Sequence, residues 1–331
     1  MIRWKKVAKR QEESGIRYGV QGTREILWPG HTLNTKSYTL YLAPYLYIPF
    51  ISNGAVMSYV HGYSEREFER LRDQSGILES LLHSGTSYPA GSKVLEAGCG
   101  VGAQTRILAK ISPGAHITSI DISEESIAKA NRAIENESIL NVTFHRASVL
   151  SMPFPDECFD HVFVCFVLEH LEDPPKALLE IKRVLKPGGS ITVIEGDHGS
   201  CFWHPETEAS LKLWDAMIDA QKMIGHDPLI GRRVFPLFKQ AGFNVKNVSP
   251  RWVYTDSSNA DLMDGVVNRI IVPMVESAKA RILRSEMVDK STWDKGIEDL
   301  GKSGMPPEGT FFYTWFKGVG VKDKLISKRP L

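Results

Sequence analysis

The chain has 331 residues, of which 42% are apolar and 24% are charged. These values are ordinary for a soluble globular protein with one large domain or two small ones. A formal net charge of +1 gives no electrostatic reason to expect nucleic acid as a partner. The four cysteines show neither paired nor metal-type spacing. We therefore expect free thiols in a reducing cytoplasm, and no metal site.

The first 56 residues differ from the rest of the chain, because they are basic and show no sustained helical or strand period. The apolar run 38–51 is shorter than the roughly 20 residues of a spanning helix, and Pro44 and Pro49 interrupt it. We expect neither a membrane span nor a signal peptide. The segment is either a membrane-surface or partner-binding arm, or a non-native extension upstream of a true start at Met57. We favour the second interpretation.

From residue 57 onward, the pattern predicts helices alternating with apolar strands. Apolar residues at helical spacing predict a helix over 64–83. Alternation of strands and helices then implies a parallel sheet covered on both faces. Strands are predicted at 93–96, 116–121, 142–147, 159–167, 190–195, 244–254 and 310–320, and helices at 104–111, 124–134, 175–184, 206–225 and 232–241. Residues 260–300 are predicted to form a mostly helical insertion that caps a substrate pocket.

A strand–turn–helix with three alternate glycines follows the first predicted strand. Glu96 ends that strand, and Gly98, Gly100 and Gly102 follow it. Glycines there let a backbone approach a nucleoside closely, because no Cβ intervenes. Asp121 ends the second strand roughly 20 residues later, where a carboxylate can bind two ribose hydroxyls. The same loop spacing also satisfies the dinucleotide pattern of dehydrogenases, so this loop alone leaves two fold families open.

Three further motifs follow in order: Ser151-Met152-Pro153-Phe154, a strand that ends in Leu168-Glu169-His170, and Leu185-Lys186-Pro187-Gly188-Gly189. With them, the chain resembles class I S-adenosylmethionine (SAM) methyltransferases between about Met57 and His198. The resemblance is to the methyltransferase type 11 branch that includes quinone-biosynthesis enzymes, within an uncharacterised subgroup. It implies a Rossmann-like, doubly wound α/β fold. The expected sheet has seven strands, the last of them antiparallel, and carries a helical cap.

The resemblance also implies a division of the chain and a set of cofactor contacts. We expect a lid helix at 57–92, a SAM-binding core at 93–200, C-terminal helices with the cap and last strands at 201–321, and a tail at 322–331. Asp121 would bind the ribose, Ile122 would pack on adenine, and Ser148 stands where many relatives carry an acid. The predicted cofactor-binding residues are Tyr63, Glu96, Gly98, Gly100, Gly102, Thr105, Asp121, Ile122, Ser148, Val149, Phe166 and Glu169.

The acceptor side is predicted from the end of the fifth strand. His198 is the candidate general base or acceptor-binding group, and adjacent Asp197 would hold its tautomer or raise its pKa. An anionic or aromatic acceptor would be recognised by residues farther on, namely His204, Arg232, Arg233, Arg251 and Tyr254. The expected reaction is methyl transfer from SAM to a small-molecule acceptor by in-line displacement, and a homodimer is left open. The alternatives are a SAM-binding regulatory or scaffold protein without turnover, and a nicotinamide-dependent oxidoreductase.

Overall fold

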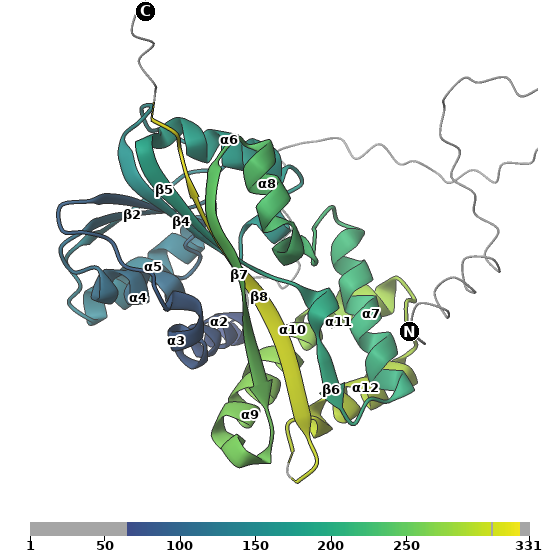
Figure 1. Cartoon of the computed structure of the whole chain (residues 1–331). Helices are drawn as coiled ribbons and strands as arrows, with labels where there is room; N and C mark the ends of the chain where they lie inside the picture. Colours follow the sequence, from purple (N-terminus) through teal and green to yellow (C-terminus); the bar gives the residue numbers. More distant parts are fainter. Residues whose placement is uncertain (1–64, 306, 325–331) are drawn as a thin grey trace, which may run out of the picture. The chain divides into compact units, whose positions relative to one another are not determined.

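A central eight-stranded sheet organises residues 65–305 and 307–324, the part of the chain that this computed structural model describes (Figure 1). The strand order is β3-β2-β1-β4-β5-β8-β6, and β7 pairs with β8. The predicted arm before Met57 and the lid residue Tyr63 lie outside the described residues. The strands are β1 Lys93–Ala97, β2 His116–Asp121, β3 Val142–Arg146, β4 Phe159–Cys165, β5 Leu185–Gly196, β6 Phe202–His204, β7 Asn244–Thr255 and β8 Thr310–Val321.

The first five strands are parallel, as the alternation of strand and helix predicts. Alternate residues of β1 enter different cores: Val94 packs in one hydrophobic cluster and Leu95 in another. The same alternation separates Phe163 of β4 from its neighbours Val162 and Val164. A strand buried on both faces is what a parallel sheet between two helical layers requires. The predicted doubly wound α/β fold is confirmed.

The helices cover both faces of the sheet and also form the predicted cap. Helices α6 and α8 pack beside β5, β7 and β8, whereas α4 packs against β2 and the α2 helix. The helices are α2 Glu65–Ile77, α3 Glu79–His83, α4 Ala103–Ile111, α5 Glu124–Asn136, α6 Pro174–Val184, α7 Glu208–Lys222, α8 Val234–Gln240, α9 Ala260–Val266, α10 Val272–Ser277, α11 Lys279–Arg284 and α12 Lys290–Lys302. Short 3-10 turns are η1 Leu168–His170, η2 His198–Ser200, η3 Ile230–Arg233 and η4 Ser257–Asn259, and η5 Val267–Ile271 is a π-helix.

Strand β8 is antiparallel to both of its long neighbours, β5 and β7, which confirms the expected antiparallel last strand. The sheet has one strand more than predicted. Gly196 at the end of β5 pairs with Trp315. Nearer the start of β8, Phe312 pairs with Phe202 of the three-residue β6. A strand of three residues is too short to show an alternating pattern, so the sequence carries no sign of β6.

The single helix expected over 64–83 is in fact two helices, α2 and α3, separated at Leu78. Leu78 has a φ of −100° and a ψ of 6°, which is not helical geometry. Gly76 lies just before the break, and glycine favours helix less than alanine by about 1 kcal/mol. Apolar periodicity continues across the break, which explains why the pattern suggests one helix.

The cap consists of α9, η5, α10, α11 and α12, inserted between β7 and β8 as predicted. It packs against α2 through α9, η5 and α10, and against α7 through α11 and α12. Figure 1 shows α10, α11 and α12 near α7, with α9 beside the ends of β7 and β8. No helix among the described residues is both long and apolar enough to cross a membrane. The division of the chain at residues 57, 93, 201 and 322 stays a prediction.

Candidate active site

A pocket lies where β1, β2, β4 and β5 end and the chain passes into loops. This is the edge of an open α/β sheet at which ligands bind, outside the carboxyl ends of the parallel strands. Its walls come from the glycine loop, from α2, from the segment after β4 and from the cap. Nine residues predicted as site residues line it: Gly98, Gly100, Asp121, Ile122, Ser148, Val149, Phe166, Glu169 and His198.

The start of the glycine loop is hydrogen-bonded to the end of β2. The backbone N–H groups of Gly98 and Cys99 both donate to the carbonyl of Ile120, at 2.8 and 2.9 Å. Gly98 has a φ of +79°, and a Cβ on it would lie 2.4 Å from Cγ2 of Val167. Gly100 has a φ of +51°, but a Cβ there would meet no protein atom within 4 Å. The loop therefore packs tightly at Gly98 and leaves open space at Gly100.

Glu96 and Thr105 support this loop from behind. The Glu96 carboxylate accepts hydrogen bonds from the Thr105 hydroxyl at 2.6 Å and from the Ser119 hydroxyl at 2.7 Å. Burial raises the pKa of Glu96 to about 7, against the effect of these two hydrogen bonds. Neither Glu96 nor Thr105 belongs to the described pocket lining, and Gly102 is also outside it, at the start of α4. These three residues support the loop, and their contact with a cofactor, direct or through water for Glu96, stays a prediction.

Asp121 lies in the pocket with both carboxylate oxygens held by backbone donors. Oδ2 accepts the Gly100 N–H at 2.9 Å, and Oδ1 accepts the Ser123 N–H at 2.8 Å. Burial raises the pKa of Asp121, while these backbone hydrogen bonds oppose the increase. Each oxygen keeps a second lone pair, so the carboxylate can still accept from two hydroxyl groups. Ile122 follows it and presents an apolar surface to the same pocket.

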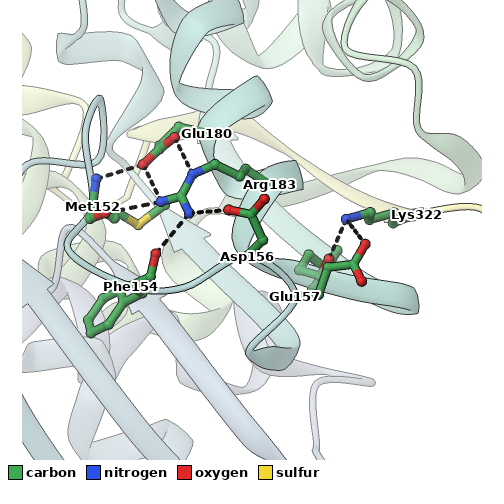
Figure 2. A network of polar contacts seen from close by, with 8 residues as sticks. Met152, Phe154, Asp156, Glu157, Glu180, Arg183 and Lys322 are labelled. Atoms are coloured by element: carbon green, nitrogen blue, oxygen red, sulfur yellow. Dashed lines mark hydrogen bonds and ion pairs between the residues drawn. The ribbon is translucent and has the colours of Figure 1, made fainter.

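Ser148 and Val149 reach the pocket on the loop between β3 and the Met-Pro-Phe turn. Arg183 of α6 anchors this turn, as Figure 2 shows: its guanidinium donates to the carbonyls of Phe154 and Met152 at 2.8 and 3.0 Å. Glu180 binds the same guanidinium and accepts the Met152 N–H at 2.7 Å. The anchor thus fixes where this loop can place Ser148 and Val149.

Replacing Arg183 by alanine is expected to weaken SAM binding although the side chain does not line the pocket. Loss of hydrogen bonds to a charged group destabilises by about 1.5–3 kcal/mol, and a loosened turn would position Ser148 and Val149, the predicted adenine contacts, less well. We expect a decrease in SAM affinity of roughly 5–20-fold by calorimetry, which corresponds to about 1–2 kcal/mol. Arg132→Ala, at an exposed position on α5, is the control. Equal affinities in both variants would contradict the proposed link.

Phe166 and Glu169 occupy the segment that follows β4. Phe166 has a φ of +59°, in the left-handed region, and its N–H donates to the carbonyl of Ile194 at 2.9 Å. Glu195 holds the next turn, because its Oε1 accepts the N–H groups of Val167 at 3.0 Å and Leu168 at 2.7 Å. Burial raises the pKa of Glu169 to about 7, while the charge of Arg70 opposes the increase. The left-handed backbone of Phe166 is a strained conformation, and such strain in a pocket residue is typical of functional sites.

His198 lines the pocket as predicted, but its partners are different. Asp197 binds Arg232, with Nε and Nη2 at 2.7 and 2.8 Å from its two carboxylate oxygens, and accepts the Gly199 N–H at 3.0 Å. The imidazole instead contacts the Tyr313 hydroxyl at 2.6 Å. Burial lowers the pKa of His198 to about 3, and the charge of Arg70 lowers it further. The prediction that Asp197 holds the imidazole or raises its pKa is therefore wrong.

A low pKa for His198 makes the folded state sensitive to acid. The unfolded chain takes up this proton below pH 6.5 and the folded chain only near pH 3, so stability falls as the pH falls through that interval. Between pH 6 and pH 4, urea unfolding of the parent should lose about 2 kcal/mol more than unfolding of His198→Gln. The comparison isolates this histidine from other titrating groups. Identical pH dependence of the two proteins would refute the assignment.

The structure also brings residues into the pocket that sequence reasoning missed. Tyr313 and Trp315 come from β8, Arg70 from α2, and Ile270 and Ile271 from the π-helix of the cap. The sequence does indicate that Tyr313 and Trp315 lie together, since residues at alternate positions of a strand share one face of the sheet. The residues suggested for an anionic or aromatic acceptor are not in the described pocket lining. These residues are His204, Arg232, Arg233, Arg251 and Tyr254.

Comparison with known proteins agrees with this geometry. Residues 95–193 match a family model described as a methyltransferase domain. A protein of Bacillus halodurans C-125 that is assigned to the methyltransferases has a similar fold, with a TM-score of 0.50 and 18% sequence identity; the match covers 75% of this chain and 99% of that one. Glycine loop, acidic strand end and sheet topology define a Rossmann-like nucleoside-binding protein. The match to the methyltransferase domain and the fold together support a class I SAM-dependent methyltransferase with SAM as its cofactor.

Proteins of similar sequence include further methyltransferases. An uncharacterised methyltransferase of Schizosaccharomyces pombe is 29% identical over 235 residues, which are 67% of this chain and 81% of that protein. A 37.1 kDa transposon protein of Streptomyces fradiae is 34% identical over 59% of this chain and 56% of its own length. The demethylmenaquinone methyltransferase of Listeria welshimeri is 33% identical over 32% of this chain and 45% of its own length. The match thus spans about half the length of the last two relatives.

Proposed function

We propose that this enzyme transfers the methyl group of SAM to a small-molecule acceptor bound in the same pocket. The observation that carries the proposal is the continuity of that pocket. The Gly100–Asp121 contact lies at one part of its lining, and apolar residues of the cap, Ile270, Ile271 and Met274, lie at another. A nucleoside and a second molecule can therefore meet within one partly enclosed space. The name of the Listeria relative, a demethylmenaquinone methyltransferase, supports a small-molecule acceptor.

The pocket residues fit SAM in chemistry as well as in position. We assign the ribose hydroxyls to Asp121, the adenine to Ile122, Ser148 and Val149, and the amino-acid part to the neighbourhood of Glu169. Open space at Gly100 suits close backbone contact with the cofactor. The cofactor supplies an electrophilic methyl group on a sulfonium.

The protein aligns the two reactants and excludes water from them. These two effects account for much of the acceleration of an in-line displacement. Burial keeps His198 neutral near pH 7. This low pKa argues against His198 as a general base, since an effective general base has a pKa near the working pH. Methyl transfer would then suit an acceptor that is nucleophilic without losing a proton to His198.

Calorimetry and turnover together test this function. We expect SAM and S-adenosylhomocysteine to bind with micromolar or tighter affinity and NAD to show no binding under the same conditions. Incubation with SAM and a fractionated metabolite extract should release S-adenosylhomocysteine in at least one fraction. Binding of SAM without release in any fraction would favour a regulatory or scaffold protein. Binding of NAD in preference to SAM would overturn the proposal.

A further inference from the structure

The part of the pocket beyond the cofactor residues has an apolar wall and a polar wall. Ile270, Ile271 and Met274 of the cap supply the apolar one. On the polar side, His198 and Tyr313 both line the pocket and contact each other. Both are almost completely buried, with exposed fractions of 4% and 2%. Buried polar groups that face a cavity at fixed positions are the groups that orient a ligand.

A chain of hydrogen bonds sets the direction of the Tyr313 hydroxyl. Nε2 of Gln221 lies 3.4 Å from Nε2 of His198, and Nδ1 of His198 lies 2.6 Å from the Tyr313 hydroxyl. With the amide nitrogen of Gln221 turned toward the imidazole, the matching tautomer is the one in which Nε2 accepts and Nδ1 carries the proton. His198 then donates to the tyrosine oxygen. The hydroxyl proton of Tyr313 is then left for another acceptor, and the residue lines the pocket.

The backbone beneath this hydroxyl is shaped for it. A Cβ on Gly196 would lie 2.6 Å from the Tyr313 oxygen, closer than real side chains allow. Glycine at the end of β5 thus leaves the space that the hydroxyl occupies. Burial raises the pKa of Tyr313 well above its usual value, so the group keeps its proton near neutral pH. The hydroxyl is therefore a positioned donor.

The basic side chains around this chamber are paired within the protein or uncharged. The Arg70 guanidinium donates to both Glu67 carboxylate oxygens, at 2.8 and 2.5 Å, and to the Gln74 side chain at 2.9 Å. Burial lowers the pKa of His226 to about 4, so this imidazole is neutral at physiological pH, like that of His198. An anionic ligand would lose its hydration here without gaining an unpaired cation in return, which is unfavourable.

We propose that the acceptor is a molecule without negative charge that has an apolar body and an oxygen that accepts a hydrogen bond from Tyr313. The apolar body would rest on Ile270, Ile271 and Met274. The inference rests on the proposed methyl-transfer function and adds to it the class of acceptor and an acceptor-binding residue. Gln221 and His198 are positioning residues, because they act through the tyrosine.

Three probes of nearly equal shape test the proposal on the full chain saturated with S-adenosylhomocysteine. Acetophenone carries a carbonyl oxygen, α-methylstyrene replaces that oxygen by CH₂, and benzoate replaces the acetyl group by a carboxylate. By titration calorimetry or ligand-observed NMR, acetophenone should bind about 5-fold tighter than α-methylstyrene, as expected for one neutral hydrogen bond. Benzoate should bind at least about 10-fold more weakly than acetophenone, because its charge is desolvated.

Variants identify the donor. Tyr313→Phe should remove the preference for acetophenone and leave the affinity for α-methylstyrene unchanged, and Gly196→Ala should do the same by displacing the hydroxyl. Tyr88→Phe removes another buried hydroxyl, outside the pocket lining, and should change nothing. Preferred binding of benzoate, no binding of acetophenone, or equal weakening of both neutral probes by Tyr313→Phe would overturn the inference alone. Failure of S-adenosylhomocysteine itself to bind would instead overturn the proposed function and, with it, this inference.

Discussion

Replacing Asp121 by alanine is expected to lower the affinity for SAM by at least about 100-fold. The substitution removes a carboxylate that we assign to two ribose hydroxyls, and hydrogen bonds to a charged group contribute about 1.5–3 kcal/mol each. It also frees the backbone N–H of Gly100, which the carboxylate now holds at 2.9 Å. Both effects act on the same ligand, so they add. Calorimetry with SAM measures the result directly.

Two further variants show whether the ribose or the fold is responsible. Asp121→Asn keeps one acceptor oxygen and should lose less affinity than alanine. Asp261→Ala removes an exposed acid at the start of α9 and should bind SAM like the parent. Thermal unfolding of the ligand-free proteins serves as the fold control. Parental SAM affinity in Asp121→Ala would remove the ribose assignment altogether.

A Gly98→Ala variant should lose both stability and SAM binding. Its φ of +79° disfavours any residue with a side chain, which amounts to about 1–2 kcal/mol. The new Cβ would also lie 2.4 Å from Cγ2 of Val167, and overpacking destabilises by about 1–3 kcal/mol. We expect the free energy of unfolding to fall by about 2–5 kcal/mol in total. The shift of Val167 would disturb the segment that carries Phe166 and Glu169.

Two other glycines separate the causes. Gly91 has the same φ of +79°, and a methyl group added to it would meet no atom within 4 Å, so Gly91→Ala reports backbone strain alone. Gly100→Ala adds a methyl group into open space at the pocket and should weaken SAM binding more than it weakens the fold. Urea unfolding and calorimetry on the three variants give the comparison. Equal stability of Gly98→Ala and Gly91→Ala would show that the contact with Val167 is unimportant.

The part of the pocket that we assign to the cofactor was largely predictable because its signals are local. Gly98, Gly100 and Asp121 belong to two successive strand–turn units, and the parallel sheet must bring the carboxyl ends of such neighbours together. The course of the chain through β1 to β5 follows from the same alternation of apolar strands and helices. Glu96 shows where local patterns stop being informative, because a motif does not reveal whether a carboxylate faces the ligand or the Thr105 hydroxyl behind the loop.

The part that we assign to the acceptor was not predictable, because contacts between distant residues form it. His198 and Tyr313 lie 115 positions apart and meet only when β8 enters the sheet beside β5. Adjacency in the sequence suggested Asp197 as the partner of His198, yet Arg232 binds Asp197 from a separate turn. The burial that lowers the pKa of the imidazole is likewise a property of tertiary packing. Such burial cannot be inferred from the sequence alone.

The position of the cap has a consequence for how such enzymes can diversify. Thr255 at the end of β7 pairs with Phe311 at the start of β8, so the whole cap is the connection of one β-hairpin. Its two ends leave the sheet side by side, and loops tolerate large changes in length at small entropic cost. A replacement of this connection that keeps its contacts with α2 and α7 is therefore expected to change the apolar wall of the pocket, while the loops after β1 and β2 stay the same.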